Sequence, residues 1–173
     1  MNEMLNYLIT NSPALVVATP LIGAFLTPLV GMINDKIRNI FVIIIALLTG
    51  FFAILLANDV FNNGIRTYAF GSSSPMTSPV VRIFFEVDGM SAFMGLIAVI
   101  LTIVAVIYSW AFIENETGQS KYYTLILLMT TGMLGMVLTG DMFNFFVFLE
   151  ITSISSAALV AFWTNKRNSV QAA

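Results

Sequence analysis

Residues 143–154 read FNFFVFLEITSI, an apolar stretch in which Glu150 is the only ionisable side chain. The helix is expected to begin near Asp141, nine residues before Glu150. At about 1.5 Å per residue, the carboxyl group then lies roughly 13 Å inside a hydrocarbon layer about 30 Å thick. Because inserting an acid at that depth costs about 2.5–3.5 kcal/mol, we expect Glu150 to face a partner, water or a moving ion. The stretch predicts a membrane helix that can load and release a proton at mid-depth.

The composition of the whole chain is typical of an integral membrane protein. Hydrophobic residues make up 58% of its 173 residues and charged residues 9%. Several uncharged runs of about 18 or more residues are long enough to cross a bilayer. They lack the polar alternation of barrel strands, so they are expected to be helices, which satisfy their own backbone groups in lipid.

We therefore predict an all-α transmembrane fold, with residues 1–173 forming a single membrane domain. The five predicted spans are Pro13 to Ile33, Ile40 to Ala57, Met90 to Ile113, Tyr122 to Thr139 and Met142 to Trp163. Pro13 suits the first turn of its helix, whereas Pro20 and Pro28 are expected to kink it.

Several kinds of site are excluded by residues that the sequence lacks. The chain has no Cys and no His, which removes thiolate-ligated iron–sulfur clusters, His-ligated haem and zinc sites built on those residues. It shows no basic stripe typical of nucleic-acid binding and no nucleophile–base pair or phosphate loop. We predict no cofactor, no metal site and no nucleic-acid partner. Whether the chain is part of an enzyme complex stays open.

The basic residues predict how the chain is oriented. If the N-terminus lies outside, five of the seven basic residues fall on the inner side: Lys36, Arg38, Lys121, Lys166 and Arg167. Arg66 and Arg82 fall on the outer side. Because inner loops carry an excess of Lys and Arg, we expect a multi-pass protein of the cell membrane with its N-terminus outside and its C-terminus in the cytoplasm.

The connection between the second and third spans carries a β pattern. From residue 81 to residue 88 the pattern has a period of two. The odd positions carry Val81, Ile83, Phe85 and Val87, and the even positions carry Arg82, Phe84, Glu86 and Asp88. Ile65 to Phe70 is the expected partner strand, and residues 71–75 (GSSSP) have the chemistry of a loop. We predict a small β-hairpin on the outer membrane surface, with an irregular loop as the alternative.

A tight turn is predicted between the last two spans. Gly140 suits a left-handed position that ends one helix, and Asp141 suits the N-cap of the next. For Asp141, stabilisation of the helix start is the expected role, and ion entry is the alternative. Thr131, Gly135 and Thr139 recur every four residues, which permits close helix packing.

Two neighbours are expected to decide what Glu150 does. Ser153 lies on the same face, because three residues turn a helix by about 300°, and its hydroxyl group can hydrogen-bond the carboxyl group. Every Lys and Arg falls in a connection or at a helix end, so a cation that pairs with Glu150 is expected from another polypeptide. The alternative is a protonated Glu150 that holds two helices together by a hydrogen bond.

Residues 139–156, TGDMFNFFVFLEITSISS, closely resemble the fifth-helix signature of antiporter-like subunits. These are the Mrp-type cation/proton antiporter D subunit and its relatives in complex I and in membrane-bound hydrogenase-like complexes. The segment VDGMS at 87–91 and Tyr122-Tyr123 support the match. The resemblance implies a proton- or sodium-translocating membrane subunit with an outer β-hairpin. It also implies that a glutamate at the position of Glu150 pairs with a lysine on a later helix and gates proton movement.

The resemblance covers only the first five helices of this longer family, so we expect the later helices and their lysines to be absent from this chain. We expect one piece of a split subunit, a short paralogue or a truncated product. The prediction is a subunit of a multisubunit proton- or sodium-translocating complex, of Mrp antiporter or redox-driven hydrogenase-like type. Glu150 would serve as its proton relay, with Ser153 and Asp141 in support. Expected partners are lipid, protons or sodium ions, and other membrane subunits, one of which supplies the lysine. The alternative is a structural bridging subunit of the membrane arm without transport of its own.

Overall fold

The computed structural model describes residues 2–69, 83–113 and 118–162. Its helices are α1 (Asn2–Gly31), α2 (Asp35–Asn63), α3 (Gly89–Phe112), α4 (Gln119–Leu138) and α5 (Met142–Val160). Two strands, β1 (Arg66–Ala69) and β2 (Phe84–Val87), lie between α2 and α3. All five helices are long and apolar enough to cross a membrane, so the predicted fold is confirmed. The predicted end of the last span at Trp163 falls outside the described residues.

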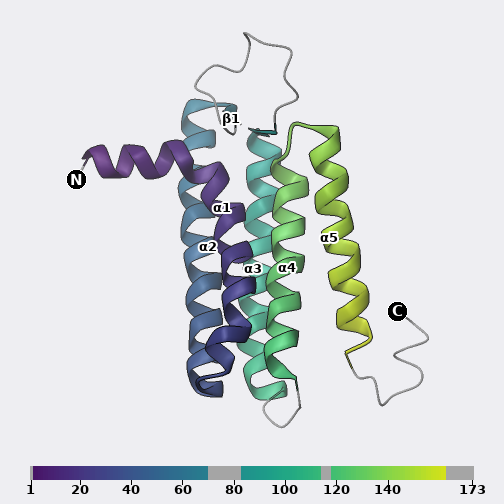
Figure 1. The fold of residues 1–173 in the computed structure, drawn as a ribbon. Helices are drawn as coiled ribbons and strands as arrows, with labels where there is room; N and C mark the ends of the chain where they lie inside the picture. Colours follow the sequence, from purple (N-terminus) through teal and green to yellow (C-terminus); the bar gives the residue numbers. More distant parts are fainter. Residues whose placement is uncertain (1, 70–82, 114–117, 163–173) are drawn as a thin grey trace.

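Helices α1 to α4 form a bundle, and α5 stands at its edge (Figure 1). In the bundle, α1 and α3 each pack against both α2 and α4. One buried apolar cluster includes Val16, Leu56, Val99 and Leu134, one residue from each of the four helices. Helix α5 packs along α4 and has two buried residues, Asn144 and Ser155. Most of the surface of α5 is therefore left uncovered by the described part of the chain.

The first helix begins earlier than predicted and contains Pro13 in its interior. The expectation that Pro13 occupies the first turn is wrong, because α1 already starts at Asn2. A proline inside a helix leaves the carbonyl four residues earlier without its usual donor. Here that carbonyl belongs to Ile9, and the hydroxyl group of the buried Ser12 donates to it at 2.7 Å. In Figure 1 the first part of α1 runs at a steep angle to the rest of the helix.

Pro28 leaves a second carbonyl free, and α4 supplies its donor. The carbonyl four residues before Pro28 is that of Ala24, and Thr124 Oγ1 on α4 donates to it at 3.3 Å. The same hydroxyl group lies 2.9 Å from the carbonyl oxygen of Ser120 in its own helix. The interruption in α1 thus becomes a polar contact between two packed helices.

The predicted β-hairpin is confirmed where the structure describes it. β1 pairs antiparallel with β2, in a register that runs from Arg66 opposite Val87 to Ala69 opposite Phe84. Phe85 and Val87 are buried and Glu86 is exposed, so the alternation in the sequence corresponds to the two faces of the strand. The predicted strand residues Phe70, Val81 and Arg82 and the loop at 71–75 lie outside the described residues.

Polar contacts attach the strands to the adjacent ends of two helices. Arg66 Nε lies 3.0 Å from Oδ2 of Asp59, a buried residue near the end of α2. Asn63 Nδ2 donates to Asp59 Oδ1 at 2.8 Å. The hydroxyl group of Tyr68 donates to Asn11 Oδ1 on α1 at 3.2 Å. The sheet is therefore fixed to α1 and α2. Its strand β2 also contacts the turn between α4 and α5.

Candidate functional site

The site begins with the contact that holds α5 against α4. At Gly132, an added Cβ would overlap Thr152 Oγ1 and lie 2.9 Å from the carbonyl oxygen of Phe148. At Gly135, an added Cβ would overlap the aromatic ring of Phe148. The predicted packing role of Gly135 is therefore confirmed, and sequence reasoning missed Gly132. The two glycines let the backbones approach closely, and Phe148 and Thr152 define the side of α5 that faces α4.

Glu150 lies on the opposite side of α5. At about 100° per residue, its direction differs by about 180° from the mean direction of Phe148 and Thr152. The residue is exposed, and neither of the two ion pairs among the described residues, Arg38–Asp35 and Arg66–Asp59, includes it. Its carboxylate therefore points away from the bundle, in the middle of a helix long and apolar enough to span a membrane.

The exposed face around Glu150 is aromatic toward the start of α5 and small or branched toward its end. Its exposed residues include Phe143, Phe146, Val147, Ser153 and Ile154. Ser153 shares the face with Glu150, as predicted. In the structure, however, the Ser153 hydroxyl group donates to the carbonyl oxygen of Leu149 at 2.8 Å. The predicted hydrogen bond from Ser153 to the Glu150 carboxyl group is thus not formed here.

Asp141 caps α5, more than two helical turns away from Glu150. Its Oδ1 accepts a hydrogen bond from the Phe143 amide at 3.1 Å, so the predicted N-cap is confirmed. Its Oδ2 is shielded from solvent and receives no hydrogen bond from the described residues. An open pocket of about 240 Å³ adjoins it. The pocket is lined by Thr139, Gly140, Asp141, Met142 and Phe145.

The turn before Asp141 is held by the sheet rather than by a left-handed glycine. Among the described residues only Gly64 and Gly118 have positive φ, so the left-handed conformation predicted for Gly140 is wrong. Gly140 is instead required by close approach, because an added Cβ would overlap the Phe84 ring and lie 2.9 Å from Glu86 Cβ. Its amide donates to the Phe84 carbonyl oxygen at 3.2 Å.

Three further contacts link the turn, β2 and α5. Thr139 forms a β-bridge with Phe85 and accepts a hydrogen bond at Oγ1 from Asn144 Nδ2 at 3.1 Å. The Phe85 ring lies 6.3 Å from that of Phe148, measured between centroids. The start of α5 is therefore positioned by α4 on one side and by β2 at its end.

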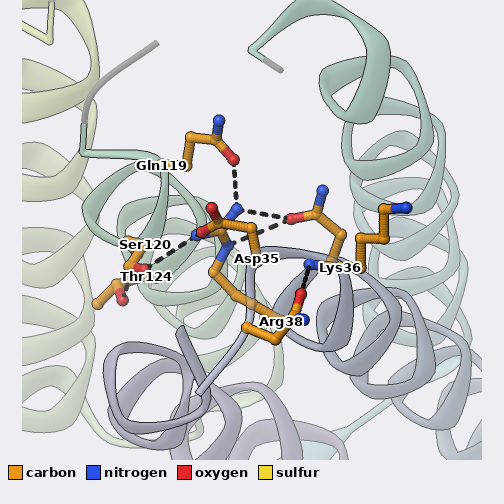
Figure 2. Close-up of polar contacts among 8 residues, drawn as sticks. Asp35, Lys36, Arg38, Gln119, Ser120 and Thr124 are labelled. Atoms are coloured by element: carbon orange, nitrogen blue, oxygen red, sulfur yellow. Dashed lines mark hydrogen bonds and ion pairs between the residues drawn. The ribbon is translucent and has the colours of Figure 1, made fainter. Parts of the chain in front are cut away.

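A second polar cluster, shown in Figure 2, lies at the opposite end of the bundle and centres on Arg38. Sequence reasoning treated Arg38 as a charge in a connection, but it lies in the first turns of α2 and is 2% exposed. Its Nη2 donates to Asn39 Oδ1 at 2.9 Å and also to Gln119 Oε1, and its Nη1 donates to Ser120 Oγ at 3.3 Å. Nη1 also pairs with Asp35 Oδ1 at 2.5 Å.

The Tyr123 ring completes the surroundings of this guanidinium group, whose Cζ lies 5.7 Å from the ring centroid. The cluster therefore joins the start of α2 to the start of α4. No sequence signal places Arg38 inside, since a charged residue near a helix start normally stays in water.

One carboxyl group outside the spans has a shifted pKa. Asp88 caps α3, and its side chain accepts a hydrogen bond from the Ser91 amide at 2.7 Å. Hydrogen bonds from the Ser91 amide and hydroxyl groups stabilise the ionised form, so they lower the pKa of Asp88 below its usual value near 3.8. Within the described residues, no group of three acidic side chains is arranged to hold a metal ion.

Comparison with known proteins confirms the resemblance of the fifth-helix sequence: the homologues of this chain are antiporter-like membrane subunits. It is 32% identical over 154 residues to NADH-quinone oxidoreductase subunit N of Desulforudis audaxviator, covering 87% of this chain and 30% of that protein. It is 31% identical over 109 residues to the Na(+)/H(+) antiporter D subunit of Alkalihalophilus pseudofirmus, covering 62% of this chain and 21% of the relative. No protein-family model matches the chain.

A solved structure shares the fold. It is that of the membrane-bound sulfane sulfur reductase, an archaeal respiratory membrane complex. One chain of it matches with a TM-score of 0.79 and 29% sequence identity over 92% of the present chain and 32% of its own length. The chain thus spans about a third or less of the length of these relatives. Their homology and the five apolar helices identify a multi-pass membrane protein whose homologues are subunits of multisubunit membrane complexes.

Proposed function

We propose that the chain is a subunit of a multisubunit complex that moves protons or sodium ions across the cell membrane, with Glu150 as a proton relay residue. The observation that carries the proposal is the placement of Glu150, in the middle of a membrane-length helix and directed away from α4. A carboxylate so placed is costly in lipid, and ionisable groups inside membranes usually serve transport. The homology to antiporter subunits supports the same reading.

The relay needs a cation that the described residues do not place near Glu150. A lysine on a neighbouring segment would favour the ionised carboxylate when it is close, and the carboxylate would take up a proton when the lysine withdraws. We propose that another membrane subunit brings this lysine to the exposed face of α5. Ser153 lies on that face and can assist the relay if its hydroxyl group turns from Leu149. Asp141 stands at the end where α5 begins and can attract cations there.

We further propose that the N-terminus lies outside and the C-terminus lies in the cytoplasm. Lys36, Arg38 and Lys121 lie at the start of α2 and α4, at one end of the bundle. Arg66 lies in β1, at the other end. By the rule that inner segments carry more Lys and Arg, the sheet then faces the outside. Lys166, Arg167 and Arg82 lie outside the described residues.

The test replaces Glu150 with Gln in the native complex, reconstituted in vesicles, and follows proton and sodium fluxes separately. Glutamine keeps the size of the side chain but cannot carry a proton. We expect proton-coupled transport to fall by about 100-fold or more, as for loss of a positioned proton-transfer group. The matched control is Glu86→Gln, which removes an exposed carboxylate from β2 and should leave transport unchanged.

A second function is favoured by the absence of a mid-membrane cation among the described residues. In it, the chain is a structural bridge that holds other membrane subunits together and carries no ions. This function requires Glu150→Gln to transport at the rate of the unmodified complex. It also requires removal of the chain to separate its neighbours in the complex on purification. Normal transport by the Gln variant would therefore reject the relay and leave the bridge.

A further inference from the structure

The contact between Gly132 and α5 involves backbone atoms as well as side chains. An added Cβ would overlap Thr152 Oγ1, and it would also lie 2.9 Å from the Phe148 carbonyl oxygen and 3.0 Å from the Thr152 amide nitrogen. The Thr152 side chain can turn aside, but backbone atoms inside a helix cannot. Any side chain at position 132 therefore has to increase the separation between α4 and α5 at this contact.

Glu150 lies on the side of α5 directly opposite the Gly132 contact. Since its direction is about 180° from the mean of Phe148 and Thr152, the line from Gly132 through the axis of α5 continues toward Glu150. A push at Gly132 therefore drives the carboxyl group outward, along the direction in which it must meet its partner.

We infer that Gly132 is a positioning residue for Glu150: its missing side chain sets how far the carboxyl group stands from α4. The inference rests on the proposed function, because its main readout is proton transfer through Glu150. Misplacing a reacting group by about 1 Å can cost about 100-fold in rate. We therefore expect Gly132→Ala to lower transport by about tenfold to 100-fold while the complex still assembles.

The chain offers a matched control at Gly95, which is buried on α3. There an added Cβ would meet Leu134 Cδ2 at 3.8 Å, an ordinary van der Waals distance. Gly95→Ala makes the same chemical change within a membrane helix without moving α5. It should assemble and transport as the unmodified complex does.

The experiment compares both alanine variants in the reconstituted complex, with two readouts. The first is the proton flux. The second is the rate at which a carbodiimide labels Glu150, followed by mass spectrometry of the intact chain, with Glu150→Gln as the unlabelled reference. A purely structural loss would lower the amount of complex and leave the labelling rate per assembled complex unchanged. Repositioning of Glu150 changes that rate.

A second variant covers the case in which Gly132→Ala fails to assemble. The double change Gly132→Ala with Thr152→Ala removes the nearest overlapping atom and leaves the two backbone contacts, so a smaller displacement is expected. Its transport should lie between that of the unmodified complex and one tenth of it, with altered labelling, while Thr152→Ala alone should be normal. If Glu150→Gln abolishes transport and both position-132 variants behave like Gly95→Ala, the inference is overturned and the relay stands. If Glu150→Gln is silent, the relay itself is rejected.

Discussion

Replacing Arg38 with methionine removes the guanidinium group from the cluster that joins α2 to α4. Methionine keeps an unbranched apolar stem, so the lost interactions are mainly the hydrogen bonds. The buried Asn39 Oδ1 loses both of its donors, Nε at 3.2 Å and Nη2 at 2.9 Å. Gln119 and Ser120 lose one contact each, and both are only partly buried, so water can replace part of the loss.

The magnitude follows from these burials. An acceptor left buried without a donor costs about 1–3 kcal/mol. Counting Asn39 fully and Gln119 in part, we expect Arg38→Met to lower the free energy of unfolding by roughly 2–4 kcal/mol. Asp35 provides the contrast, because its side chain is 74% exposed although its oxygen lies 2.5 Å from Nη1. Its substitution by Asn should cost only about 0.2–1 kcal/mol, as for exposed ion pairs.

The assay is reversible unfolding of the purified chain in mixed micelles, titrated with a denaturing detergent and followed by circular dichroism. The expected order of stability is unmodified, then Asp35→Asn, then Arg38→Met. Equal losses in the two variants would show that the ion pair and not the buried hydrogen bonds holds the cluster. A loss below about 0.5 kcal/mol for Arg38→Met would show that the guanidinium group is solvated, because surface changes typically fall in that range.

Two further expectations concern the opposite end of the bundle. Gly140→Ala should destabilise the fold by about 1–3 kcal/mol through overlap with the Phe84 ring, and hydrogen exchange at the amide of position 140 should accelerate. Unchanged exchange would contradict the close packing of β2 on this turn. The lowered pKa of Asp88 means that its ionised form is favoured in the folded chain. Its stabilising effect on the start of α3 should be complete above the usual pKa near 3.8 and be lost as the pH falls through the lower folded-state value. Asp88→Asn should retain the cap and abolish this acid dependence, as measured by exchange at the Ser91 amide, and a retained dependence would assign it to another group.

The parts of the fold that could be predicted are those decided by local sequence. A bilayer requires long uncharged runs, so the five spans follow from composition. Asp141 precedes an apolar helix and caps it because an Asp side chain accepts hydrogen bonds from the first amides. The alternation before α3 predicted a strand, and β2 confirms it.

The parts that could not be predicted depend on which segments meet. Gly140 looked like a left-handed turn residue, but its requirement comes from the Phe84 ring, which is distant in sequence. Arg38 looked solvated, because nothing local reveals that Gln119 and Ser120 come to surround it. Pro13 looked like a helix start, since the sequence does not show that Ser12 satisfies the carbonyl it frees. The sequence does not show which side of α5 faces α4. The contact of Gly132 with Phe148 and Thr152 shows it, and therefore shows that Glu150 points away from α4.

The bond between Thr124 and the Ala24 carbonyl makes two distant positions dependent on each other. A residue with an amide hydrogen in place of Pro28 would satisfy that carbonyl within α1, and the hydroxyl group at position 124 would become redundant there. Conversely, a valine at 124 would leave an orphaned oxygen in an apolar interior as long as the proline remains. Among natural variants of this chain, Pro28 and a hydroxyl group at position 124 should therefore be retained or lost together, because the proline in α1 creates the need for the donor on α4.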